Sequence, residues 1–582
     1  MFIHNNEVAA IFNQIADLLE INGDNPFRIR AYRNAARMLN TLAPSVQTMV
    51  AEKRDLKDLP GIGVDLAGKI GEIVTTGTCA LREQLRRELP PAIHELLMVP
   101  GLGPKRVRML YQELNIQTLE QLYRAARDGQ ISHVPGFGRR VEQRILEAMQ
   151  ARQSKKARFT IAVAEQVVKP LMTYLQAQKK ARQVEVAGSF RRRQETVGDL
   201  DILISSFRPQ QVVQQFVRFD GIAQVLAQGG TRASVVLRQG MQVDLRVVAE
   251  VSFGAALHYF TGSKAHNIAM RTLAQERGLK MNEYGIFSTI LSHARRVAGE
   301  TEVSVFNALG LPYIEPELRE NRGEIAAAQA GQLPALVSLS DLSGDLHVHT
   351  RASDGQNSLR EMALEAKRRG LSYLGITDHS SRLAVAHGLD AAGLSRQMDE
   401  IDQLNAELPG ITLLKGIEVD INEDGTLDLP DSILARLDLV IGAVHSKFAL
   451  SRERQTERIL RAMDHPCFTL LAHPSGRLIL EREPYDVDMP RIIRHAKQRA
   501  CFLELNSQPS RLDLTDIYCM MAKEEGVLIS VNSDAHSVFD FDHVRFGIGQ
   551  ARRGWLEKEN ILNTRPVEQL MPILSSARRC CR

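Results

Sequence analysis

The 582-residue sequence lacks the features that mark membrane-spanning, secreted or disulfide-stabilised proteins. No apolar run approaches the roughly 20 positions that a membrane-spanning helix requires. The N-terminal stretch carries acids and no basic leader, which is not the pattern of a signal peptide. Six cysteines occur without a C-x-x-C spacing, so neither a disulfide framework nor a zinc ribbon is expected. We expect a cytoplasmic protein with no membrane partner, and we expect it to be a monomer.

The chain is too long for one hydrophobic core, and its charge is unevenly distributed. Its length predicts roughly three to five structural units. Residues 1–340 carry a net charge of +10 and residues 341–582 a net charge of −6, which together give the total of +4. The basic front part predicts a polyanionic partner. Ten of the 16 histidines lie in the acidic back part, as a site for several metal ions would require.

Three short glycine phrases recur in the front part: LPGIG at 59–63, VPGLG at 99–103 and VPGFG at 134–138. Each precedes an amphipathic, partly basic segment, as in a helix-hairpin-helix element. Glycines there allow a tight turn, and the following helix offers N–H groups and its dipole to a phosphate. Such binding reads the DNA backbone and not the base sequence. The alternative is an ordinary turn in a helical bundle. The predicted DNA contacts are Gly61, Gly63, Gly101, Gly103, Lys105, Gly136 and Gly138.

A pair of acids stands in the stretch GDLDILIS. Asp199 and Asp201 lie two residues apart in a predicted strand, so both carboxylates point to one face. Two such carboxylates repel each other unless a cation lies between them, and Mg²⁺ suits oxygen ligands. Asp244 lies on another predicted strand with the same pattern, and three acids can hold two ions for in-line phosphoryl transfer. The alternative is an acidic strand end that faces solvent.

Residues 1–315 resemble the family X DNA polymerases. The resemblance rests on NPFRIRAYRNAA, the glycine phrases, GSFRR followed by GDLDIL, VDLR, and HYFTGSKAHNIAMRTLAQERGLKMNEYG. It implies a Mg²⁺-dependent polymerase that uses deoxynucleoside triphosphates on gapped or nicked DNA. Arg193 departs from the family pattern, because some members have glycine there. The resemblance makes Asp199, Asp201 and Asp244 metal ligands; Gly188, Ser189, Arg192 and Gly198 triphosphate contacts; Tyr259, Phe260 and Gly262 the sugar pocket; Asn267 a contact to the base edge; and Arg271 a contact to the template.

Lys69 comes shortly after the first glycine phrase. In family members with a lyase domain, a lysine at this position forms a Schiff base with an abasic sugar, which requires a lowered pKa. A second lysine common nearby is Asp65 in this chain, so the predicted pocket is less basic. Two interpretations stay open: a lyase nucleophile and a simple phosphate contact.

From residue 341 short apolar strands alternate with helices, which predicts parallel strands and a β/α barrel. In such barrels the strand ends converge on one rim. Histidines and acids lie at the ends of these predicted strands. This mixture of nitrogen and oxygen ligands suits Zn²⁺ or Mn²⁺, with Fe as a further candidate. The number of ligands predicts up to three ions. The alternative for a lone histidine is a hydrogen-bonded structural residue. The predicted ligands are His347, His349, Asp354, His379, Glu418, His445, His473, Asp534 and His536.

Residues 341–582 resemble the PHP (polymerase and histidinol phosphatase) phosphoesterases, and the whole chain resembles bacterial family X polymerases with a C-terminal PHP domain. The resemblance implies three ligand sets and hydrolysis of phosphate esters. It implies gap filling in base excision repair, a 3′–5′ exonuclease, and AP endonuclease or 3′-phosphatase activity as further candidates. The implied sets are His347, His349, Glu418 and Asp534; Glu418, His445 and His473; and Asp354, His379 and His536.

The predicted fold is multidomain, with helical helix-hairpin-helix domains, an α+β nucleotidyltransferase palm and thumb, and a distorted TIM-like β/α barrel of the PHP type. Three alternatives stay open: a nuclease whose polymerase part only grips DNA, a polymerase whose barrel only stabilises the fold, and a non-catalytic DNA-binding adaptor. The predicted parts are a helical lyase-like domain (1–85), a fingers-like domain (86–150), the palm (151–250), the thumb (251–315), a linker (316–340) and the PHP domain (341–582).

Overall fold

The structure, a computed structural model, describes residues 3, 5–42, 45–89, 93–97, 99, 102–151, 158–288, 295–383 and 386–578. Gly101, which was predicted to contact DNA, lies outside these ranges, as do Cys580 and Cys581. The chain folds as two compact units, residues 1–157 and residues 158–582. No helix in the described ranges is long and apolar enough to cross a membrane.

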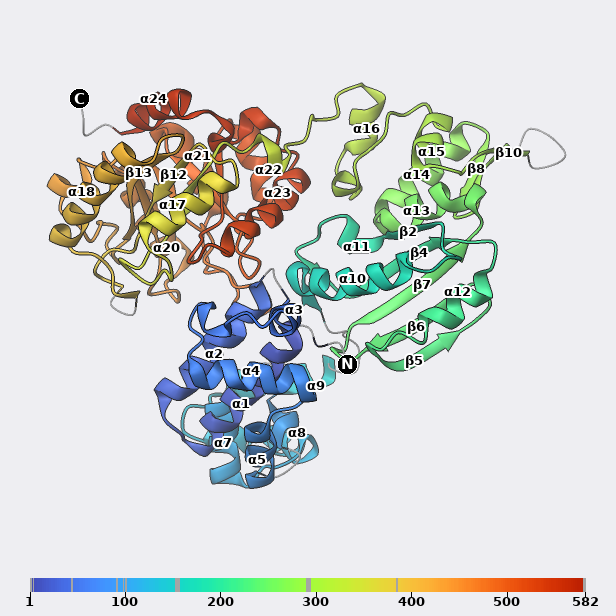
Figure 1. The fold of residues 1–582 in the computed structure, drawn as a ribbon, viewed down its shortest axis with the longest axis horizontal. Helices are drawn as coiled ribbons and strands as arrows, with labels where there is room; N and C mark the ends of the chain where they lie inside the picture. Colours follow the sequence, from blue (N-terminus) through green and yellow to red (C-terminus); the bar gives the residue numbers. More distant parts are fainter. Residues whose placement is uncertain are drawn as a thin grey trace. The chain divides into compact units, whose positions relative to one another are not determined.

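The first unit contains helices and no strand in its described residues (Figure 1). The side chain of Asn25 caps the second helix by accepting a hydrogen bond from the N–H of Phe27. The first two helices pack through the edge-to-face rings of Phe12 and Tyr32, whose centroids are 5.4 Å apart. The helices are α1 (Asn5–Asn22), α2 (Pro26–Thr41), α3 (Val46–Ala51), α4 (Val64–Thr76), α5 (Ala80–Glu88), α6 (Ile93–Leu96), α7 (Pro104–Leu114), α8 (Leu119–Arg127) and α9 (Arg139–Ala151).

The second unit begins with a five-stranded sheet, here called the palm sheet, of strand order β2-β4-β7-β6-β5. Strands β4 and β7 are parallel, and the other neighbours are antiparallel. Leu200 and Ile202 of β4 are buried against helices α10 and α12, so the alternating Asp199 and Asp201 point to the opposite face. The elements are β2 (Gln183–Val186), β4 (Asp199–Ser205), β5 (Ile222–Gln228), β6 (Arg232–Leu237), β7 (Gln242–Val248), α10 (Ile161–Gln176) and α12 (Pro209–Phe216).

Residues 253–318 form a thumb subdomain of helices and a small antiparallel sheet of order β10-β9-β8. Its core continues into the segment predicted as a linker, because Leu318 and Ala328 are buried in the same cluster as Phe306. The segment 316–340 is therefore packed, and it contains helix α16 (Glu324–Gln329). The other elements are α13 (Phe253–Thr261), α14 (Lys264–Glu276), β8 (Leu279–Asn282), β9 (Gly285–Ser288), β10 (Arg295–Ala298) and α15 (Glu302–Ala308).

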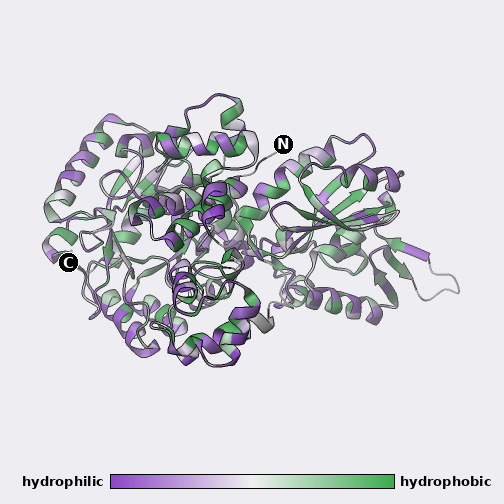
Figure 2. Cartoon of the chain, turned by 90° about the horizontal axis from the view of Figure 1, so that it is seen from below, coloured by the Kyte–Doolittle hydropathy of each residue, from purple (hydrophilic) through white to green (hydrophobic). Residues whose placement is uncertain are grey.

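The C-terminal part is a parallel barrel of seven strands, β11 to β17 in chain order, which confirms the predicted β/α barrel (Figure 1). The N–H of His349 donates to the carbonyl of Ala535 at 2.8 Å, so the first and last strands nearly close the barrel. Hydrophobic residues run along the strands, and the helices carry both kinds of residue (Figure 2). The strands are β11 (Gly344–Val348), β12 (Tyr373–Ile376), β13 (Thr412–Asp420), β14 (Leu439–Ala443), β15 (Leu470–Leu471), β16 (Phe502–Asn506) and β17 (Ile529–Asn532). The helices are α17 (Leu359–Arg368), α18 (Ala391–Glu407), α19 (Asp431–Leu434), α20 (Arg452–Asp464), α21 (Met489–Arg499), α22 (Asp516–Glu525), α23 (Val544–Arg553) and α24 (Val567–Ala577).

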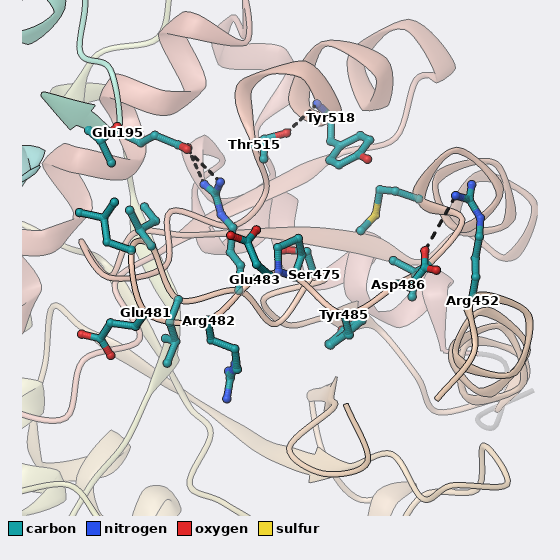
Figure 3. A pocket seen from close by; sticks show the side chains of 18 residues that line it. Glu195, Arg452, Ser475, Glu481, Arg482, Glu483, Tyr485, Asp486, Thr515 and Tyr518 are labelled. Atoms are coloured by element: carbon teal, nitrogen blue, oxygen red, sulfur yellow. Dashed lines mark hydrogen bonds and ion pairs between the residues drawn. The ribbon is translucent and has the colours of Figure 1, made fainter. Parts of the chain in front are cut away.

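A pocket of about 800 Å³ lies where the barrel loop 475–487 meets the turn that precedes β4 (Figure 3). Glu195 enters it from the palm side and pairs with Arg477 of the barrel at 2.7 Å. Three arginines and four acids line the pocket, so its charge does not favour a polyanion. None of the predicted metal ligands is among the lining residues. The pocket therefore lies at the contact between palm and barrel and not at a predicted metal site.

Candidate functional site

The palm sheet brings the three predicted acids together. Asp201 and Asp244 are direct register partners on the parallel strands β4 and β7, and Asp199 precedes Asp201 on the same face. Burial raises the pKa of Asp201, and the neighbouring Asp199 and Asp244 raise it further, to about 7. Three oxygen donors that repel one another fit a hard divalent ion such as Mg²⁺. Among the described residues, groups of ligand atoms within 4.8 Å of one another occur in the barrel and not here, so the palm acids are more widely spaced.

Gly188 allows the close approach of the chain to these acids. It opens the short helix α11 (Gly188–Arg191) with a φ of +64°, a conformation that favours glycine. A Cβ atom there would lie 2.5 Å from Oδ2 of Asp201. Ser189 lies in the same turn, and Gly198 lies beside the guanidinium of Arg158. The structure thus places the predicted triphosphate loop directly over the acids.

Arg192 is held in place by two acceptors. Its Nε donates to Glu320 at 2.8 Å, and its Nη1 donates to the carbonyl of Thr261 at 2.7 Å. Sequence reasoning missed Glu320, although the charged stretch ELRENRGE in an apolar segment was a usable signal. The next residue, Arg193, adopts a φ of +55°, a backbone conformation that favours glycine, the residue that some family members have there.

The thumb residues predicted for the sugar and base pocket lie together at the end of α13 and the start of α14. The Nδ2 of Asn267 donates to the carbonyls of Tyr259 (2.7 Å) and Gly262 (3.1 Å), while its buried Oδ1 makes no hydrogen bond within the described chain. The Tyr259 and Phe260 rings meet edge to face, with centroids 5.2 Å apart. The guanidinium of Arg271 lies 5.8 Å from the centre of the Tyr259 ring. The Asn267 amide therefore stabilises the turn between α13 and α14, and its Oδ1 stays available as a hydrogen-bond acceptor.

The described glycine turns share one backbone pattern, in which a buried carbonyl accepts from the N–H three residues later. The pairs are Leu59 with Ile62, Val99 with Leu102, and Val134 with Phe137, at 3.0–3.1 Å. Gly61 and Gly136 adopt φ angles of +69° and +81°, and Gly63 and Gly103 cap α4 and α7. No atom lies within 4 Å of a Cβ built at Gly61, Gly63, Gly103 or Gly138, and Lys105 is exposed. This open side leaves the helix N-termini accessible to a phosphate.

Lys69 lies in a different environment from the one that a Schiff-base lysine needs. Its Nζ makes an ion pair with Asp65, and the Tyr32 hydroxyl lies 3.5 Å from the same carboxylate. Burial lowers the pKa of Lys69, but Asp65 and Tyr32 outweigh this effect, so the net pKa is raised. A protonated amine is a poor nucleophile, and the arrangement favours a phosphate contact.

In the barrel, the first predicted ligand set converges on one point. The Nε2 of His347 lies 3.5 Å from carboxylate oxygens of both Glu418 and Asp534. The Nε2 of His349 lies 3.6 Å and 3.2 Å from the same two oxygens. Both Nε2 atoms are buried and make no hydrogen bond within the described chain. Two nitrogens and two carboxylate oxygens of this kind fit a divalent transition-metal ion.

The second predicted set shares Glu418 with the first. Its Oε1 lies 2.9 Å from the Nε2 of His473 and 3.3 Å from the Nε2 of His445. The other oxygen of Glu418 lies 2.8 Å from the Nδ1 of His379, so Glu418, His379 and His445 form a further compact group. A carboxylate whose two oxygens face different groups of histidines can bridge two metal ions.

The third predicted set is grouped around Asp354. Its oxygens lie 3.6 Å from the Nε2 of His379 and 3.5 Å from the Nε2 of His536. His349 completes a compact group of four with these residues, and its ring stacks on that of His536 at 4.1 Å. All nine predicted barrel ligands therefore meet at one rim. The compact groups differ from the implied sets, because His379 joins Glu418 and His445, and His349 joins Asp354, His379 and His536.

The acids give this rim a strong attraction for positive charge. Burial lowers the pKa of His379, but Glu418 and Asp354 reverse this effect and raise it to about 10. Asp354 and Asp534 likewise overcome burial and raise the pKa of His536 to about 9. The facing histidines hold the pKa of Glu418 far below its usual value despite its burial. A cluster that attracts protons so strongly is suited to divalent cations.

Two carboxylates that sequence reasoning missed orient the histidines. Glu504 lies 2.7 Å from the Nδ1 of His347, and Asp420 lies 2.5 Å from the Nδ1 of His445. Such contacts leave each Nε2 directed at the candidate metal positions and fix the ring orientation. Glu504 and Asp420 also lie in short apolar β runs, FLELN and GIEVD, like the predicted ligands. That shared position was the signal available in the sequence.

Family models match consecutive parts of the chain. A helix-hairpin-helix domain matches residues 3–79, and a SAM-like helix-hairpin-helix tandem matches residues 93–151. The DNA polymerase beta palm matches residues 160–245, and the DNA polymerase beta thumb matches residues 256–320. The PHP domain matches residues 345–508.

Curated relatives match either the whole chain or its barrel. The chain is 37% identical over 574 residues to a Bacillus subtilis protein named DNA polymerase/3'-5' exonuclease PolX, covering 98% of this chain and 99% of the relative. A Thermoanaerobacter sp. protein named probable phosphatase is 32% identical over 231 residues, covering 38% of this chain and 89% of the relative. An Acetivibrio thermocellus protein, also named probable phosphatase, is 30% identical over 212 residues, covering 34% of this chain and 83% of the relative.

Proposed function

The chain belongs to the family X DNA polymerases that carry a C-terminal PHP domain, and we propose that it fills short gaps in DNA and removes nucleotides from 3′ ends at two separate metal-dependent sites. One observation supports this most directly. The three predicted palm acids lie on the neighbouring strands β4 and β7, and eight of the nine predicted barrel ligands fall into compact groups that could hold metal ions. The ninth, His473, lies 2.9 Å from Glu418. This coexistence argues against a barrel that only stabilises the fold and against a palm that only grips DNA.

For the polymerase reaction, Asp199, Asp201 and Asp244 would hold divalent ions, for which we propose Mg²⁺. Such ions lower the pKa of a 3′-hydroxyl and neutralise the triphosphate. The loop that begins at Gly188 would approach the triphosphate with its backbone, and Arg192 would add a guanidinium. The described glycine turns would hold gapped or nicked DNA by its phosphates.

For the exonuclease reaction, the nine barrel residues would hold up to three ions, for which we propose Mn²⁺ or Zn²⁺, with Fe as a further candidate. Bound ions of this type activate water and polarise a phosphodiester. Glu504 and Asp420 would keep His347 and His445 in their ligating orientation. The shared Glu418 would keep two ions close together.

A second candidate function for the barrel is removal of 3′-phosphates, which the relatives named probable phosphatases favour. Cleavage at abasic sites would use the same ligands. For Lys69, the raised pKa favours a phosphate contact over a lyase. We also propose that these reactions serve base excision repair and that the protein acts as a monomer.

The test uses gapped, 3′-recessed DNA with and without nucleotides, in Mg²⁺ and in Mn²⁺. Asp201→Ala should abolish extension and spare exonuclease activity, and His347→Ala should do the reverse. Asp220→Ala removes an exposed palm acid paired with Arg238, and His495→Ala removes a histidine on α21; both controls should keep both activities. Extension that survives Asp201→Ala would refute the palm assignment. Exonuclease activity that survives His347→Ala would refute the barrel assignment.

A further inference from the structure

The segment between thumb and barrel carries charged side chains that bind both. Glu320 accepts a hydrogen bond from Arg553, the last residue of α23, at 2.9 Å. Arg553 also donates to Asp516 at 2.6 Å, and Arg322 donates to the same carboxylate at 2.9 Å. Arg553 is only 3% exposed, so this ionic contact is shielded from solvent and weakly screened by salt. The barrel is therefore joined by hydrogen bonds to Glu320.

Glu320 in turn binds the palm loop of residues 188–194, here called the nucleotide loop because it is predicted to contact the triphosphate. The same Oε1 atom accepts from the Nε of Arg192 at 2.8 Å and from the Nε2 of Gln194 at 2.6 Å. The Nη1 of Arg192 donates to the carbonyl of Thr261. The Nη2 of Arg192 makes no hydrogen bond with the described residues. Two of the three guanidinium nitrogens are thus fixed, and the third is left as a donor. A guanidinium held in this way is preorganised for a phosphate oxygen.

The ionised side chains linked to Glu320 carry a net positive charge. Glu320 alone would cancel the charge of Arg192. Ion pairs link three guanidinium groups, those of Arg192, Arg553 and Arg322, with the two carboxylates of Glu320 and Asp516, so the net charge of this group is +1. Arg553 contributes the positive charge that offsets Glu320, so the group as a whole stays cationic. The group consists of Arg192, Glu320, Arg553, Asp516 and Arg322.

A second contact ties the same loop to the barrel. Arg193 comes directly after Arg192 with its φ of +55°, and its side chain packs on Gly549 of α23. A Cβ added to Gly549 would lie 3.3 Å from the Cβ of Arg193, closer than most such contacts. The palm loop and α23 are therefore matched in shape as well as in charge.

We propose that Glu320 is a positioning residue for the incoming nucleotide, orienting Arg192 toward the triphosphate while Arg553 of the barrel offsets its charge. The barrel then sets the affinity of the polymerase for nucleotides, in addition to its own hydrolytic role. This inference rests on the proposed function, in which Arg192 contacts the triphosphate.

Glu317 provides a matched control. It lies in the same segment, is similarly buried, and pairs with Arg552, the neighbour of Arg553, at 2.7 Å. It makes no contact with the nucleotide loop in the described structure. Glu317→Gln and Glu320→Gln each remove one negative charge from the thumb–barrel contact, and only the second acts on Arg192.

The experiment measures single-nucleotide insertion on gapped DNA by the full-length chain, with KM for the nucleotide and kcat determined separately. Glu320→Gln should raise KM about tenfold, the size expected for one charge-assisted hydrogen bond, with kcat changed less than about twofold. Glu317→Gln should keep the wild-type KM. The 3′–5′ exonuclease rate of each preparation should stay at the wild-type value and reports correct folding of the barrel.

An equal rise of KM in both variants would show a merely structural contact and overturn the proposal. A fall of KM in Glu320→Gln would show that Glu320 competes with the triphosphate, which also overturns it. If Glu320→Gln does not fold, Arg553→Lys serves instead, because one ammonium cannot bridge both carboxylates as a guanidinium does, and KM should rise about threefold. A wild-type chain that fails to extend DNA would refute the proposed function itself, whatever the variants do.

Discussion

Replacing Gly188 by alanine should separate backbone strain from damage to the palm acids. The φ of +64° at this position costs a residue with a side chain about 1–2 kcal/mol. The new Cβ would lie 2.5 Å from Oδ2 of Asp201, whereas ordinary contacts begin at 3.4 Å, so the carboxylate must shift by about 0.9 Å. A misplacement of this size at a reacting centre costs about 100-fold in rate. We therefore expect kcat for nucleotide addition to fall about 100-fold.

Gly240 offers a control with the same backbone cost and no clash. It lies in the turn between β6 and β7 with a φ of +86°, and nothing lies within 4 Å of a Cβ built there. Gly240→Ala should lower stability by the backbone cost of about 1–2 kcal/mol alone and keep nucleotide addition within about threefold of wild type. Primer extension and thermal unfolding of both variants measure the two effects separately, with exonuclease activity as an internal reference.

The reasoning would be refuted if Gly188→Ala and Gly240→Ala lost nucleotide addition equally. That result would mean that Asp201 can move without consequence, or that strain alone lowers the rate. A loss of exonuclease activity in Gly188→Ala would likewise contradict two separate metal centres.

Further predictions concern other parts of the chain. Glu504→Gln should lower exonuclease activity and metal affinity about 10- to 100-fold and spare extension, because His347 loses its carboxylate partner; equal loss of both activities would contradict this. Despite burial, Arg319 and Arg191 lower the pKa of Glu302 to about 2, so its ion pairs contribute about 3 kcal/mol above pH 4.5 and lose it as the pH falls toward 2. The difference in unfolding free energy between wild type and Glu302→Gln should therefore shrink between about pH 5 and pH 2, and a constant difference would refute this. Borohydride trapping of abasic DNA through Lys69 should be weak at neutral pH and rise with pH; strong trapping at neutral pH would show an unprotonated amine.

Local patterns in the sequence predicted the chemistry because they are set by local geometry. Alternation of side chains along a strand placed Asp199 with Asp201 and His347 with His349. Alternation of strands and helices predicted the parallel barrel, whose rim gathers the side chains at the carboxyl ends of the strands. The glycine phrases predicted the shared turn. None of these inferences needed a contact between distant parts of the chain.

The network around Arg192 could not be obtained in this way. Glu320 is 128 residues from Arg192 and 233 residues from Arg553, and it bonds to both. Segment 316–340 has a weak local pattern, and its role depends on the helices that pack beside it. Similarly, Glu504 acts on His347 from 157 residues away.

The sequence by itself predicted which residues would carry the chemistry, since spacing of two on a strand and placement after a strand are local properties. Only the tertiary structure decided which acid serves which histidine and which carboxylate holds Arg192. The physical reason is that charge pairing depends on distances of a few ångströms between side chains brought together by packing. The two candidate metal sites were thus predictable from the sequence, and the ionic contacts that join the palm to the barrel were not.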